Sequence, residues 1–185
     1  GYLYAGENGG YHKPYISLKY NIEADIYVSS SAIIPGEGGE FSGWDETWKI
    51  SSGLFYTVSL PSDHTLTLRA EGIFYPYGRW DNEESFRTSY DSITGQILTP
   101  GAIPGMVVYP EIVWNTGTTG FSLGLSSLIS PIDASFRGAL FASWGVYQGL
   151  TLVTNVLFEV GEEEDLFGFE REGGLLVGIG AMYKF

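Results

Sequence analysis

The chain contains no cysteine among its 185 residues, which excludes disulfides, thiolate metal sites and cysteine nucleophiles together. It also has no run of about 18 consecutive apolar residues, the length that a transmembrane helix requires. Nine basic residues stand against 22 acidic ones, and the resulting net charge of −13 makes nucleic acid an unfavourable partner. These absences argue against a helical membrane protein, a disulfide-stabilised domain and a nucleic-acid binder.

Aromatic residues and glycine are abundant instead. Phe, Tyr and Trp total 29 residues and glycine 26, a composition typical of strongly curved sheets with aromatic girdles. The length predicts a single domain over residues 1–185. Because the chain starts at Gly1 without a basic and apolar leader, we expect any signal peptide to have been removed already.

Apolar and polar residues alternate with a period of two along most of the chain, which predicts β-strands with one apolar face. At the carboxy-terminus the alternation continues from Leu175 to the terminal Phe185 without a break. Each alternating segment has about ten or more residues, enough to cross a hydrocarbon core when tilted. The segments are 16–28, 48–60, 66–74, 106–114, 121–129, 136–146, 150–160 and 175–185.

The connections between these segments alternate between long and short. Residues 35–46, 77–104 and 161–172 form long connections, whereas Pro61–His64, 116–119 and Tyr147–Gly149 are short turns. Ser130–Asp133 is the one brief connection on the long side. The long segments hold 14 of the 22 acidic residues. This alternation predicts an all-β, antiparallel up-and-down β-barrel with long acidic loops at one end.

Two strand counts fit the pattern. A hairpin turn at Glu23–Asp25, with Tyr2–Ala5 as a short first strand, gives ten strands, the number that we prefer. If Glu23–Asp25 is not a turn, residues 12–34 form one long strand and the count is eight, which the lack of glycine at the turn favours.

The final strand resembles the closing strand of bacterial outer-membrane β-barrel proteins. In that family an aromatic residue third from the end and a terminal Phe form the assembly signal, and Tyr183 and Phe185 occupy these positions here. The resemblance, to the class of small barrels, implies a transmembrane barrel in the bacterial outer membrane. It implies as partners the outer-membrane lipids, lipopolysaccharide and, during biogenesis, the barrel-assembly machinery.

The alternation also predicts which side chains face the lumen of such a barrel. Lys49, Arg69 and Glu71 are expected to form a charge cluster there, because buried charges require partners. On the later strands the lumen is expected to be apolar, which suits a small hydrophobic ligand. The candidate ligand-binding residues are Val113, Phe141, Val153 and Leu157.

The expected function is structural or transport-related, with passage or binding of small hydrophobic compounds as one form of it. A plugged structural or adhesion barrel, or a subunit of a larger envelope assembly, is the first alternative. A soluble calycin-like barrel with apolar residues inside is the second, although aromatic residues at the strand ends favour membrane interfaces.

No enzymatic activity is expected. Enzymes among the outer-membrane barrels pair His with Ser or Asp at the outer rim, but His64 lies in a short turn and His12 has no accompanying His-x-Ser motif. No spaced oxygen ligands or phosphate-binding loop occur either, so the sequence predicts no cofactor and no metal site.

Overall fold

The computed structural model describes residues 2–5, 11–32, 34–35, 48–82, 104–117, 119–168 and 174–184. Strands, turns and bends make up these residues, and none of them is helical. Accordingly, the described residues include no helix long and apolar enough to cross a membrane.

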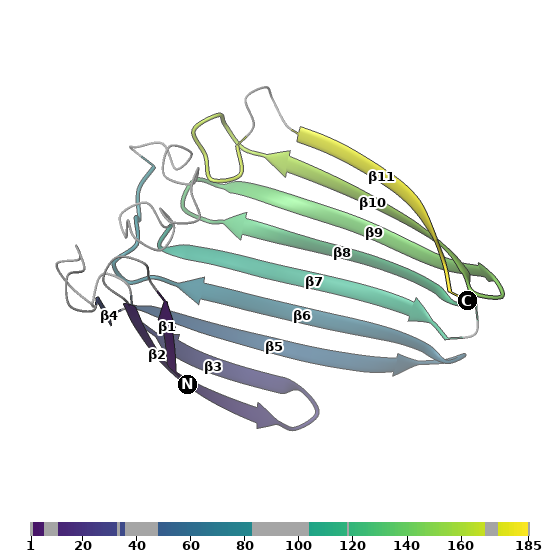
Figure 1. Ribbon diagram of the computed structural model, residues 1–185, viewed down its shortest axis with the longest axis horizontal. Coiled ribbons are helices and arrows are strands. Elements are labelled where there is room, and N and C mark those ends of the chain that lie inside the picture. Colours follow the sequence, from purple (N-terminus) through teal and green to yellow (C-terminus); the bar gives the residue numbers. More distant parts are fainter. Residues whose placement is uncertain are drawn as a thin grey trace.

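Nine antiparallel strands, each paired with the next along the chain, form one sheet (Figure 1). They are β2 (Tyr11–Asn21), β3 (Asp25–Ser31), β5 (Lys49–Leu60), β6 (His64–Phe74), β7 (Met106–Thr116), β8 (Phe121–Ser130), β9 (Ser135–Tyr147), β10 (Leu150–Val160) and β11 (Gly174–Tyr183). Two short strands, β1 (Tyr2–Ala5) and β4 (Ile34–Pro35), pair with the beginning of β2.

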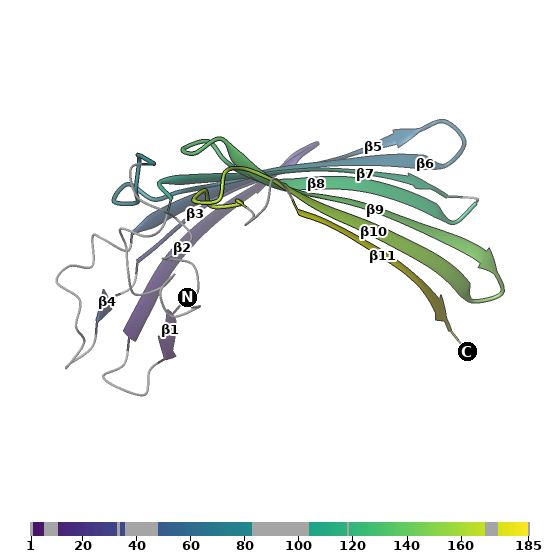
Figure 2. The ribbon, with the colours of Figure 1, turned by 90° about the horizontal axis from the view of Figure 1, so that it is seen from above.

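The predicted all-β, antiparallel up-and-down arrangement is confirmed. The sheet is nevertheless open, because β11 pairs with β10 and not with any described strand at the other edge. Figure 2 shows a curved and twisted sheet whose first and last strands lie at separate margins.

The hairpin at Glu23–Asp25 is also confirmed. The chain turns after β2, where the amide of Ile22 donates a hydrogen bond of 3.1 Å to the carbonyl of Ala24, and Asn21 pairs with Asp25. The alternative of one continuous strand over residues 12–34 is therefore wrong. Alternation alone could not separate the two, since a three-residue turn preserves which face each side chain occupies.

The turns 22–24, 61–63 and 148–149 lie at one end of the sheet, and the turn 131–134 lies at the other (Figure 1). The predicted short turns are found at 61–63 and 148–149, and residues 117, 119 and 120 belong to the one between β7 and β8. Gln148 and Gly149 both have positive φ, which matches the twist of tight hairpins. The predicted loops 35–46 and 77–104 lie largely outside the described residues.

The register places apolar side chains side by side across the sheet. One row runs without a gap from β5 to β11 and contains Tyr56, Leu68, Ile112, Leu125, Leu140, Val156 and Val177. We call the face that carries this row the apolar face, and the opposite one the polar face. Buried apolar residues in the described chain are few, namely Ala32, Leu166 and Phe167, so no second layer covers the apolar face there.

Candidate functional site

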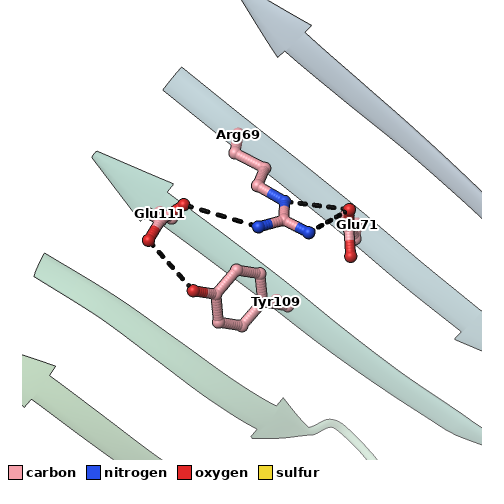
Figure 3. Close-up of polar contacts among 4 residues, drawn as sticks. All are labelled: Arg69, Glu71, Tyr109 and Glu111. Atoms are coloured by element: carbon pink, nitrogen blue, oxygen red, sulfur yellow. Dashed lines mark hydrogen bonds and ion pairs between the residues drawn. The ribbon is translucent and has the colours of Figure 1, made fainter. Parts of the chain in front are cut away.

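The polar face carries the charged residues of the strands, and its centre is an ion-pair network on β6 and β7 (Figure 3). Arg69 donates from Nε and Nη2 to Oε1 of Glu71, at 2.9 and 2.7 Å. Its Nη1 lies 3.8 Å from Oε2 of Glu111. The hydroxyl of Tyr109 donates to Glu111 at 3.1 Å, and the Arg69 guanidinium lies 5.3 Å from the Tyr109 ring centre.

The register explains why these four side chains meet. Arg69 pairs with Glu111 and Glu71 pairs with Tyr109, so all four project from adjacent positions on the same face. Gly53 on β5 pairs with Glu71, and a Cβ at Gly53 would overlap the ring of Tyr27. The glycine thus makes room for a tyrosine ring to lie flat beside the network.

Of the predicted charge cluster, the structure brings Arg69 and Glu71 into contact. Lys49 lies at the beginning of β5, four residues before Gly53, the partner of Glu71. Its Nζ is 5.8 Å from the ring centre of Tyr75. Glu111 and Tyr109 also belong to this network and were not predicted as members, although alternation along β7 places both on the face of Arg69.

Two further ion pairs lie on the polar face. Lys19 contacts Asp25 at 2.9 Å across the β2–β3 hairpin, and Arg137 on β9 contacts Glu159 on β10. Together with the Arg69 network, they give most of the strand carboxylates on this face a cationic neighbour.

The four predicted ligand-binding residues all lie on the polar face, on β7, β9 and β10. Val113 pairs with Gly124, which pairs with Phe141, and a Cβ at Gly124 would overlap the Phe141 ring. Phe141 therefore covers the sheet next to Val113. Val153 pairs with Gly180, and Leu157 pairs with Leu176.

Leu157 lines a hollow on the polar face. The hollow has a volume of about 400 Å³ and lies at the beginning of β11, where Arg137 and Glu159 provide a polar margin beside Leu157 and Leu176. Val153 lines a second hollow of about 380 Å³, whose walls come mainly from the apolar face, including Trp144, Leu152 and Ile179. The first hollow can therefore accommodate an apolar group, which would lie next to the Arg137–Glu159 ion pair.

The connection after β10 folds onto the sheet, which the sequence analysis did not predict. Leu166 and Phe167 are buried against Val107, Leu128 and Ile132. Burial raises the pKa of the neighbouring Asp165, and repulsion from Asp133, Glu162 and Glu164 raises it further. The apolar pair Leu166–Phe167 inside an acidic run was the signal available in the sequence.

The remaining predicted positions lie near the carboxy-terminus and in the turns. Tyr183 ends β11, paired with Leu150, and is about half exposed, whereas Phe185 lies outside the described residues. His64 accepts a hydrogen bond of 3.2 Å from the indole of Trp114. In the described ranges, no group of three or more His, Cys, Asp or Glu residues is placed to hold a metal ion.

No family model, curated protein or solved structure matches this chain.

Proposed function

We propose that this chain forms the wall of an integral outer-membrane β-barrel, with the apolar face toward lipid and the polar face toward the lumen. The supporting observation is an inverted pattern of exposure. Ile179 and Leu18 are 86% and 72% exposed, whereas the side chains of Glu159 and Glu111 are 15% and 19% exposed. In water an apolar face of this extent would be unfavourable, but in lipid it is the favourable arrangement.

Strand parity supports a ten-stranded barrel. With nine antiparallel strands, β2 and β11 run in the same direction and cannot form an antiparallel pair. β1 is antiparallel to β2 and therefore also to β11. We propose that the barrel closes between β1 and β11, and that an even strand count places both ends of the chain on the same side of the membrane.

Extraction from membranes tests the membrane assignment. We expect the full-length protein to remain in the membrane fraction after washing with carbonate and to be released only by detergent. Recovery in the aqueous fraction after native lysis would instead support the soluble calycin-like barrel, in which the apolar face is turned inward.

Within this proposal, the barrel binds or passes small hydrophobic compounds along the later strands, β7 to β10, where the polar face carries the apolar side chains Val113, Phe141, Val153 and Leu157. Phe141 and Leu157 lie on the neighbouring strands β9 and β10, and Leu157 borders the hollow of about 400 Å³. A plugged structural or adhesion barrel, or a subunit of a larger envelope assembly, would use the same wall without a ligand. The Arg69 network, in which two carboxylates share one guanidinium, is compatible with that alternative.

We expect the double variant Phe141→Asp/Leu157→Asp to lose binding of a fluorescent fatty-acid probe, because two carboxylates would replace the apolar contacts. Thr57→Asp, on β5 of the same face, serves as a matched control and should bind as the parent does. Probe fluorescence titrations on refolded protein measure the difference. Absence of probe binding and of bilayer current in the parent protein would leave the structural barrel as the better description.

We propose that the end of the last strand acts as the assembly signal, through Tyr183 and Phe185. A single aromatic residue contributes about 1.5–3 kcal/mol by burial, too little to determine the fold of a barrel. Deletion of Phe185 should therefore reduce membrane abundance in cells while leaving refolding into detergent almost unchanged. Equal abundance of the two proteins in isolated membranes would contradict the assignment.

The proposed environment also defines the partners. Outer-membrane lipids would contact the apolar face, and the acidic connections would attract divalent cations next to the phosphates of lipopolysaccharide. The barrel-assembly machinery would be the partner during biogenesis.

A further inference from the structure

The segment 161–168, between β10 and β11, is a compact structure of its own. The amide of Asp165 donates to the carbonyl of Glu162, and the amide of Gly168 donates to the carbonyl of Asp165, both at 3.1 Å. A Cβ at Gly168 would collide with the Glu162 carbonyl, so the bend requires glycine at this position. The segment is therefore shaped by its own hydrogen bonds and presents Leu166 and Phe167 together.

These two side chains form the buried apolar cluster on the polar face. Leu128 pairs with Arg137, and Val107 pairs with Ile73, which places both on the face that carries Arg69. Leu166 and Phe167 pack against them and against Ile132 of the turn after β8. The segment thus covers the polar face at the end of the sheet where the turn 131–134 lies.

Side chains of the β8–β9 connection hold the segment in place. Asp133 accepts hydrogen bonds from the amide of Leu166 at 2.6 Å and from the hydroxyl of Ser135 at 2.9 Å. Ser135 in turn accepts from the amide of Phe167 at 3.2 Å. Asp133 and Ser135 are both buried, so the two amides are bound by a carboxylate and a hydroxyl shielded from water.

Phe167 also contacts the margin of the hollow. The guanidinium of Arg137 lies 5.6 Å from the Phe167 ring centre, within range of a cation–π interaction. Arg137 is paired with Glu159, and both line the hollow next to Leu157. The segment therefore adjoins this hollow through Arg137, while the described lining of the hollow comes from β9, β10 and β11.

We propose that residues 161–168 are a lid that closes one end of the polar face by covering Val107 and Leu128. The inference rests on the proposed function in one respect, namely that the polar face lines a lumen. The named contacts join the segment to the β8–β9 turn and to side chains of β7, β8 and β9, and none of them is a strand-pairing hydrogen bond. The lid can therefore undock without breaking any strand pairing, in the way that segments of proteins open locally while the rest of the fold stays intact.

Two measurements test the lid on refolded full-length protein. The first is the rate at which a membrane-impermeant maleimide labels the single thiol of Leu128→Cys, a position that the segment covers. The signal is unambiguous because the natural chain has no cysteine. The second is ion current in a planar bilayer. Both are compared in the parent, in Leu166→Ala/Phe167→Ala, and in the matched control Glu163→Ala, which changes an exposed residue of the same segment.

We expect the double alanine variant to be labelled about tenfold faster than the parent, because undocking exposes what the lid protects. The Glu163→Ala control should behave as the parent. Asp133→Asn is a second variant, which weakens the hydrogen bond between Asp133 and the amide of Leu166 without removing the apolar pair. It should also accelerate labelling. Heat-modifiable migration on gels checks that each variant is folded.

The outcomes separate the lid from the proposed function. Faster labelling together with larger current supports both. Faster labelling without current in any variant supports the lid and contradicts passage through the barrel. Unchanged labelling in folded variants of both kinds would overturn the lid, whatever the current.

Discussion

Arginine in place of Leu68 is expected to destabilise the protein in lipid vesicles by about 2–4 kcal/mol, the cost of a cation at the lipid-facing midplane of a barrel. Leu54 and Leu152 should behave in the same way. All three lie on the apolar face within the interior of their strands and are 36–42% exposed. Nothing in the described structure covers them, so lipid is the environment that the substitution would disturb.

Thr67→Arg is the matched control for Leu68→Arg. Thr67 is the neighbouring residue on β6 but lies on the polar face, where its hydroxyl is 3.3 Å from that of Thr57. Since that face already holds charged side chains, arginine there should cost less. Ser51→Arg extends the comparison to β5.

Unfolding titrations in urea on protein refolded into vesicles measure these differences. If the apolar-face variants are as stable as Thr67→Arg and Ser51→Arg, the apolar face does not contact lipid. A reversed order would favour the soluble barrel with apolar residues inside.

The faces of the sheet could be predicted from the sequence because a strand fixes them with a period of two. The face of each residue follows from alternation within its strand. The short turns also set the register of β5 with β6 and of β7 with β8, so that Tyr56 pairs with Leu68 and Ile112 with Leu125. The turn at Glu23–Asp25 is the exception. Its three residues preserve the alternation and contain no glycine, so a hairpin and a long strand look the same in the sequence.

Contacts between distant residues were harder to predict. Arg69 and Glu71 are two residues apart on one strand, and their pairing follows from the strand alone. Glu111 joins them only through the register of β6 against β7, which are separated by a long connection. The contact of Leu166 with Asp133 spans 33 residues and follows no period, so alternation carries no information about it.

Arg69→Met is expected to destabilise the folded protein because it leaves two carboxylates, Glu71 and Glu111, without their shared cation. The side chains of Glu71 and Glu111 are only 26% and 19% exposed. Loss of one partner of a fully buried ion pair costs about 3–5 kcal/mol. Since Arg69 itself is 39% exposed, solvent screens part of the effect, and about 1–3 kcal/mol is the expected loss.

The triple variant Arg69→Met/Glu71→Gln/Glu111→Gln separates lost charge from lost packing. With the carboxylates neutralised, most of the stability lost in Arg69→Met should return, because no uncompensated charge remains on the polar face. Tyr109 can still donate its hydrogen bond to the amide oxygen at position 111. Urea titrations of the parent, single and triple variants in vesicles at neutral pH measure the recovery.

Arg137→Met serves as a comparison for Arg69→Met. Arg137 is more exposed, at 51%, and has one ion-pair partner in Glu159, so its replacement should cost less. If the triple variant is no more stable than Arg69→Met, the network acts through shape rather than charge. In that case the polar face would tolerate an uncompensated carboxylate pair, as a wide and hydrated lumen does. This result would contradict a plugged barrel.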